Sequence, residues 1–255
     1  MTAAAPPSGE IIFARYAFPP NELGYCGTGD GADLLAAAAG TLDTGVVGRH
    51  AGGFDGAWAY LELLADSAGI GDPLDQRVVE AYWIGNDLLD TVDPARFASM
   101  ARSRFAGQAG ADWGCLDGAA GVLPHHSFHV LAVYPWMNLL RRGAPGPALH
   151  VLDRCRIRWG EVVALHGEHV EVRSPLLEWD RGMLTLGSPV TERARWSAGG
   201  KALAGGVRCG DWVALHWDWV CETLSEVQLG ALGRATARQL EATNTSTYSM
   251  GAARG

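Results

Sequence analysis

The chain has 255 residues, of which 48% are hydrophobic and 19% are charged, and its formal net charge is −8. This composition is that of a globular protein with one large domain or two of ordinary size. The acidic balance argues against nucleic acid as a partner, because phosphate binding requires clustered Lys and Arg. No uncharged apolar run of about 18 residues is present, so we expect no membrane partner and a cytoplasmic location. The five cysteines form no Cys-x-x-Cys pair, which favours reduced thiols over a zinc knuckle.

The first half of the chain has the apolar spacing of helices. Asp93 and Pro94 form an N-cap and first-turn pair that predicts a helix over residues 94–104. We expect further helices at residues 32–42, 54–68, 73–89 and 125–140, the last with a kink at Pro135. No segment alternates like a strand, so residues 11–142 are predicted to form an all-helical domain.

A Gly- and Pro-rich linker over residues 141–147 separates this half from one with a period of two. Strands are expected at residues 151–165, 169–173, 184–186, 190–196 and 212–219. Ser225 and Gln228 have the spacing of a capping box that begins a C-terminal helix. The predicted fold class is therefore α+β. The helical domain is followed by a small OB-like β-barrel with a C-terminal helix, over residues 149–244.

Cys155 is the first candidate ligand, because it lies on the first predicted strand among arginines. A thiolate beside Arg154, Arg156 and Arg158 is expected to have a lowered pKa, which favours metal ligation or nucleophilic attack. His216 is the second candidate, on the last predicted strand. Both residues also have a plain structural interpretation as core side chains.

A histidine-rich segment supplies a third group of candidates. His125 and His129 lie four residues apart on a predicted helix, and at that spacing two imidazoles can share a metal ion. Together with His126 and with Cys26, which lies in a loop between glycines and aromatics, they define an alternative metal site. No His-Glu-x-x-His motif accompanies them, so a zinc protease is not indicated. Histidines on an apolar helix also occur as ordinary core residues.

The last two-fifths of the chain resembles the HypC/HupF family of hydrogenase assembly chaperones. The residues that carry the resemblance are Cys155, Gly160, a Val-rich stretch over residues 162–172, and the segment Gly210-Asp-Trp-Val-Ala-Leu-His216 before a short apolar strand and a helix. In that family the cysteine follows the initiator methionine, whereas Cys155 is internal. The family also has proline before the glycine, where this chain has Trp159.

This resemblance implies an accessory protein in nickel–iron hydrogenase maturation rather than an enzyme. Such chaperones bind a HypD-like scaffold and the precursor of the hydrogenase large subunit, and they carry iron as the Fe(CN)2CO fragment. The essential cysteine of the family corresponds to Cys155 and its strand histidine to His216. These two residues are therefore the implied iron ligands.

Two other functions remain open on the sequence. One is a metal-binding enzyme with its site in the helical half, and the other is an interaction module that exposes Trp217 and Trp219 to a partner. The N-terminal half resembles an uncharacterised family that shares this two-part layout. Residues 13–27 and 134–136 carry that resemblance, which supplies no function.

Overall fold

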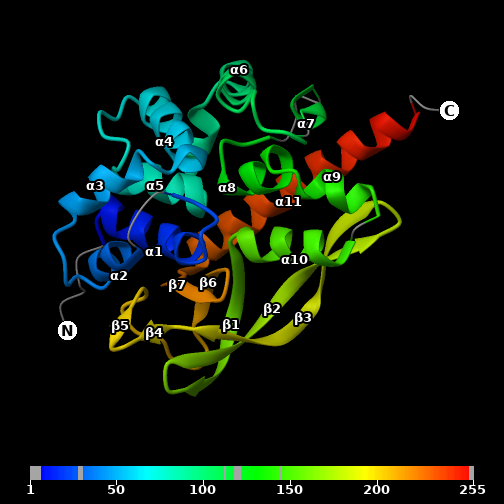
Figure 1. Ribbon diagram of the computed structural model, residues 1–255. Coiled ribbons are helices and arrows are strands. Elements are labelled where there is room, and N and C mark those ends of the chain that lie inside the picture. Colours follow the sequence, from blue (N-terminus) through cyan, green and yellow to red (C-terminus); the bar gives the residue numbers. More distant parts are fainter. Residues whose placement is uncertain (1–6, 28–30, 112, 118–121, 144, 253–255) are drawn as a thin grey trace.

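The computed structural model describes residues 7–27, 31–111, 113–117, 122–143 and 145–252 (Figure 1). A helical region comes first, a five-stranded barrel follows it, and a long C-terminal helix runs back along the helices (Figure 1). This arrangement confirms the predicted α+β class. No helix in the described part of the chain has both the length and the apolar character needed to cross a membrane.

The helical region contains short elements joined by tight turns. Asp93 caps helix α6 by accepting a hydrogen bond from the backbone N–H of Arg96 at 2.8 Å, as its sequence position predicts. The elements are α1 (Gly9–Glu22), α2 (Gly31–Ala38), α3 (Gly45–Ala51), α4 (Asp55–Ala68), α5 (Gln76–Trp83), η1 (Asp87–Thr91), α6 (Pro94–Arg104), α7 (Gly114–Asp117), α8 (His126–Phe128), η2 (His129–Val133), α9 (Trp136–Arg141) and α10 (Pro145–Cys155).

The single helix predicted over residues 125–140 is wrong, because three short pieces replace it. His125 is the N-cap of α8, the chain then widens into the π-helix η2, and α9 begins only after Pro135. Tyr134 has an extended backbone, with φ −71° and ψ 151°, because the ring of the following proline disfavours helical geometry there. The proline therefore ends the helix instead of kinking it.

The placement of Cys155 on a strand is also wrong. Cys155 is the last residue of α10, and the first strand begins at Arg158. Ala148, Leu152 and Cys155 are buried on one side of that helix, at spacings of four and three. The spacing of four from Val151 to Cys155 fits an alternating pattern as well, which explains the error. The segment predicted as a linker, residues 141–147, includes the end of α9 and the first turn of α10.

The five main strands close into a barrel in the order β1-β2-β3-β7-β6. Strands β3 and β7 pair in parallel and the other neighbours are antiparallel, which agrees with the predicted OB-like barrel. The segment predicted as one strand over residues 212–219 is a hairpin, so His216 ends the next-to-last strand of the barrel. The strands are β1 (Arg158–His166), β2 (His169–Asp180), β3 (Met183–Arg195), β6 (Trp212–His216) and β7 (Trp219–Thr223), with a separate small pair β4 (Ser197–Ala198) and β5 (Lys201–Ala202).

The two halves share one hydrophobic core. Its largest cluster combines buried residues of α1, α4 and α5 with Ala214 and Trp219 of the barrel and Leu232 of the C-terminal helix α11 (Glu226–Ala252). Ser225 and Gln228 form the predicted capping box at the start of α11, with the Gln228 N–H 3.3 Å from Ser225 Oγ. The junction between the halves is thus packed like a protein interior.

Candidate metal centre

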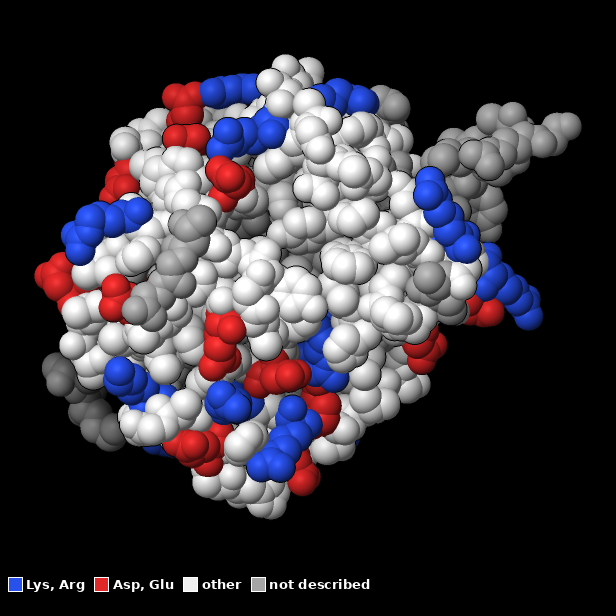
Figure 2. Space-filling view, viewed as in Figure 1, with Lys and Arg blue, Asp and Glu red and all other residues white. Residues whose placement is uncertain are grey.

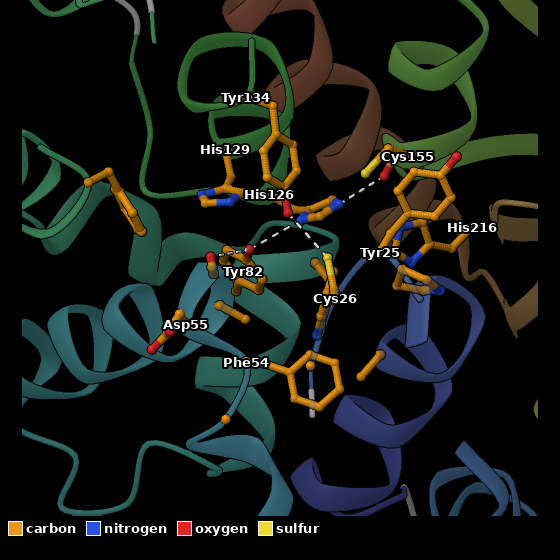
Figure 3. A pocket seen from close by; sticks show the side chains of 18 of the residues that line it. Tyr25, Cys26, Phe54, Asp55, Tyr82, His126, His129, Tyr134, Cys155 and His216 are labelled. Carbon is orange, nitrogen blue, oxygen red and sulfur yellow. Dashed lines mark hydrogen bonds between the residues drawn. The ribbon is translucent and has the colours of Figure 1, made fainter. Parts of the chain in front are cut away.

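A cavity of about 340 Å³ lies where the helical region meets the barrel. The side chains that point into it come from the end of α1 and its following loop, from α4, α5, α8 and η2, and from the last residues of α10 and β6 (Figure 3). Those labelled in Figure 3 are Tyr25, Cys26, Phe54, Asp55, Tyr82, His126, His129, Tyr134, Cys155 and His216. Residues far apart in the sequence therefore build one site.

Three of these side chains form a potential metal site. One ligand atom each from His126, Cys155 and His216 lies within 4.8 Å of the other two, and all three residues are buried. They are the one such group of three or more His, Cys, Asp or Glu side chains within the described ranges. Two imidazoles and a thiolate are ligands for zinc, iron and copper, and they leave a fourth position open in a tetrahedral site.

The backbone beside two of these ligands is held in place by hydrogen bonds. Trp217, which follows His216, donates its backbone N–H to the carbonyl of Arg154 at 2.8 Å. The Arg158 guanidinium donates in return to the Trp217 carbonyl. Trp217 has a φ of 52°, a left-handed conformation that is uncommon outside glycine and that these two contacts maintain. The hairpin turn that carries His216 is thereby attached to the chain that carries Cys155.

A buried charge cluster supports this attachment from within. The Arg158 side chain is fully buried and pairs with Glu192 of β3. Arg156 pairs with Asp153 at 2.9 Å, and the same carboxylate accepts the backbone N–H of Leu177 at 2.8 Å. Buried charges persist only where they are paired and hydrogen-bonded, so this cluster fixes the junction of α10 and β1.

His216 has a defined tautomer that leaves one nitrogen free. Its Nδ1 lies 2.7 Å from the backbone carbonyl of Tyr16 in α1, so Nδ1 carries the proton and donates it. Its Nε2 is buried and has no hydrogen-bond partner. Metal-binding histidines usually donate their second ring nitrogen to a carbonyl or carboxylate in this way. An unpaired buried Nε2 is costly, and a metal ion is one partner that would satisfy its lone pair.

His126 has two possible tautomers. Tyr82 donates its hydroxyl proton to the Gly56 carbonyl at 3.0 Å, and its oxygen lies 3.1 Å from His126 Nδ1. If Nδ1 donates to that oxygen, Nε2 is left without a proton, 2.9 Å from the carbonyl oxygen of Cys155. The other tautomer donates Nε2–H to the Cys155 carbonyl and accepts the Tyr82 proton at Nδ1, which also satisfies the imidazole. A metal ion at Nε2 would therefore select the first tautomer and displace the hydrogen bond to the Cys155 carbonyl.

Burial sets the charge of all three ligands. It lowers the pKa of His126 to about 4 and that of His216 well below 6.5, so both imidazoles are neutral at pH 7 and available as ligands. Burial, assisted by Cys26, raises the pKa of the Cys155 thiol. The expectation that the three neighbouring arginines lower this pKa is therefore wrong. Arg154, Arg156 and Arg158 form ion pairs with carboxylates instead. Metal binding must displace the thiol proton, so affinity will rise with pH.

The other predicted ligands are divided between the cavity and the core. Cys26 and His129 line the cavity, and Cys26 Sγ lies 3.2 Å from the hydroxyl of Tyr134. His125 does not line it, since its Nδ1 accepts the backbone N–H of Ser127 at 3.1 Å as a helix cap. The break in the predicted helix thus separates His125 from His129.

The chain belongs to a family of unknown function. This family, DUF6390, has a model that matches residues 5–250. The match extends over both halves, which confirms the predicted membership of an uncharacterised family with this layout. No curated protein and no solved structure matches the chain. Membership supplies no function, and the comparisons give no support to the HypC/HupF resemblance, which stays a prediction.

Sequence reasoning missed the role of His126 beside Cys155 and His216. The pairing of His125 with His129 followed from helical spacing, which does not apply across an N-cap and a π-helix. Pro135 predicts where the helix ends, but no local signal in the sequence identifies the contact of His126 with Cys155 and His216. Trp217 and Trp219, considered as exposed contacts for a partner, are 5% and 3% exposed.

Proposed function

We propose that this protein is a metal-binding accessory protein that holds a transition-metal ion between His126, Cys155 and His216. The observation that carries the proposal is the buried group itself, in which one ligand atom each from His126, Cys155 and His216 lies within 4.8 Å of the other two and His216 Nε2 has no hydrogen-bond partner. A bound ion would supply a positive charge and an open coordination position. The residues of this chain supply two neutral imidazoles and a thiolate in buried positions.

A finer proposal follows from the HypC/HupF resemblance. It assigns the protein to nickel–iron hydrogenase maturation, with iron as the Fe(CN)2CO fragment for cargo and the large-subunit precursor or a HypD-like scaffold as partner. Its support is the contact of Cys155 and His216 with one cavity, next to an OB-like barrel. A thiolate and an imidazole suit low-spin iron with strong-field ligands.

Elemental analysis and infrared spectra of the protein from its own host test both levels. The metal-site proposal predicts close to one equivalent of a transition metal in the wild type. The hydrogenase proposal adds cyanide and carbonyl stretches. Metal without these bands contradicts the finer proposal alone, and metal-free protein that also takes up no added zinc or iron contradicts both.

A matched pair of cysteine variants separates the site from the rest of the chain. Cys155→Ser removes the thiolate, and we expect it to lower metal affinity by a hundredfold or more. Cys209 is exposed and lies outside the cavity, so Cys209→Ser should leave affinity unchanged. In a host that makes a nickel–iron hydrogenase, the finer proposal predicts loss of hydrogenase activity only with Cys155→Ser.

The second candidate function is a metal-dependent enzyme that uses the same ion. The size of the cavity favours it, because about 340 Å³ falls within the range of small-molecule sites. Catalytic metal sites have three protein ligands and an open position, as this one would. Turnover of a substrate by the metal-loaded protein, lost in Cys155→Ser, would support this candidate over the accessory role.

A further inference from the structure

The proposed metal site carries a net positive charge that its own ligands do not neutralise. A divalent ion with one thiolate and two neutral imidazoles keeps one net positive charge in a buried space. Uncompensated charge is expensive there, so an anion is favoured in the open position. Among the described residues that line the cavity, Asp55 is the one with a charged side chain, and it pairs with Arg104 at 2.8 Å. The Cys26 thiol also lines the cavity, but it bonds to the Tyr134 hydroxyl at 3.2 Å and is not one of the three residues whose ligand atoms lie within 4.8 Å of one another. The site therefore favours a compensating anion from outside the chain.

His129 offers a hydrogen-bond donor for such an anion. Its Nδ1 lies 3.1 Å from the hydroxyl of Tyr60, which is fully buried. The Tyr60 hydroxyl needs an acceptor, so it donates to Nδ1 and leaves the proton of the neutral imidazole on Nε2. No hydrogen bond of the described residues uses Nε2, which lies beside Gly56 on the cavity wall. A Cβ at Gly56 would lie 2.7 Å from this nitrogen, so only glycine leaves the space open.

Most of the remaining cavity wall is aromatic or apolar, with Gln108 as a polar exception. Phe54 and Phe105 line the cavity, the ring centroid of Phe105 lies 5.0 Å from that of His129, and Tyr25 stacks on Trp217 with ring centroids 4.4 Å apart. On the face shown in Figure 2, acidic and basic side chains lie mainly around the edge and over the barrel, and the centre carries few of them. A bare inorganic anion would leave these aromatic walls without contacts.

We propose that the cavity binds a small organic carboxylate with an apolar or aromatic body. One carboxylate oxygen takes the open position of the metal, the other accepts a hydrogen bond from His129 Nε2, and the body packs against Phe54 and Phe105. This inference rests on the proposed metal site and names the class of molecule that the site receives. The inference applies whether the protein is an accessory protein or a metal-dependent enzyme.

Visible absorption of the cobalt(II)-loaded protein tests the inference with benzoate as the probe. Benzoate should shift the cobalt bands in a saturable titration while the thiolate-to-cobalt band remains. Acetate, which lacks the aromatic ring, should bind at least tenfold more weakly. Benzamide, which has the same shape as benzoate without the charge, should produce no shift. Equal binding of benzoate and benzamide, or no shift with benzoate, would overturn the inference.

Two substitutions assign the contacts. His129→Ala should weaken benzoate binding by about tenfold or more, the loss expected for a hydrogen bond to a charged group. Phe54→Leu should weaken benzoate binding and leave acetate unaffected. Cobalt affinity should be unchanged in both, which also shows that the variants fold. Unchanged benzoate affinity in His129→Ala contradicts the inference, whereas failure of the wild type to bind cobalt contradicts the metal site itself.

Discussion

The barrel and the helical region contribute to the candidate site in different ways. The barrel supplies His216, and the turn after it is attached through Trp217 and a buried charge cluster to the end of α10, which carries Cys155. The rest of the helical region supplies His126, which hydrogen-bonds to Tyr82, and most of the cavity wall. We call the group tied together by the buried charges the frame, and the segment that carries His125, His126 and His129 the cover. The difference is that buried ion pairs hold the frame, whereas neutral histidines and aromatic side chains hold the cover.

We expect the largest loss of stability from a single substitution in the frame, at its buried pair of Arg158 and Glu192. Arg158→Met removes a fully buried partner of Glu192 and should destabilise the protein by ~3–5 kcal/mol in urea unfolding. Arg173 pairs with Glu161 at the surface, so Arg173→Met is a matched control, with an expected loss of about 1 kcal/mol or less. Equal effects of the two substitutions would refute the idea of a frame held by buried ion pairs.

Low pH should reduce the free energy of unfolding of the metal-free protein, through the buried histidines of the cover. Burial lowers the pKa of His126 to about 4 and those of His125 and His129 to about 3. Unfolded imidazoles take up protons below about pH 6.5 while these buried ones do not, so the stabilisation is present above pH 6.5 and is lost as the pH falls toward 4. The share of His126 is ~3 kcal/mol. Urea midpoints measured from pH 7 to pH 4 check this, and a flat profile contradicts it.

Overpacking the barrel tests whether the two regions unfold together. A Cβ at Gly160 would lie 2.7 Å from the carbonyl oxygen of Arg173, so Gly160→Ala should cost ~1–3 kcal/mol. Gly52, in the helical region, has open space around it, and Gly52→Ala should have little effect. Because the largest hydrophobic cluster spans both regions, we expect one cooperative thermal transition at a lower temperature. Two separate transitions in calorimetry would contradict the shared core.

The smallest expected effect concerns the C-terminal helix, which packs against both regions. Ser225→Ala removes the capping box of α11 and should lower stability by ~1 kcal/mol in urea unfolding. The exposed Val227 follows two positions later, and Val227→Ala is the control with no expected loss. A loss of several kcal/mol with Ser225→Ala would mean that the helix start has contacts beyond its cap.

The same contrast explains how much of the molecule could be predicted. Alternation and turn residues were sufficient for most of the barrel, and the Asp93 and Ser225 caps were correct because capping is local chemistry. Cys155 was misplaced because a spacing of four fits both a helix and an alternating strand. His126 was assigned to a different site from Cys155 and His216, because these residues are distant in sequence and no local pattern encodes such a meeting.

X-ray absorption of the zinc-loaded protein tests the central claim most directly. The account predicts a first shell with one sulfur at about 2.3 Å and two imidazole nitrogens at about 2.0–2.1 Å, plus one light atom at the open position. The sulfur should disappear in Cys155→Ser and persist in Cys209→Ser. A wild-type shell without sulfur, or one that Cys155→Ser leaves unchanged, would contradict a metal centre at His126, Cys155 and His216.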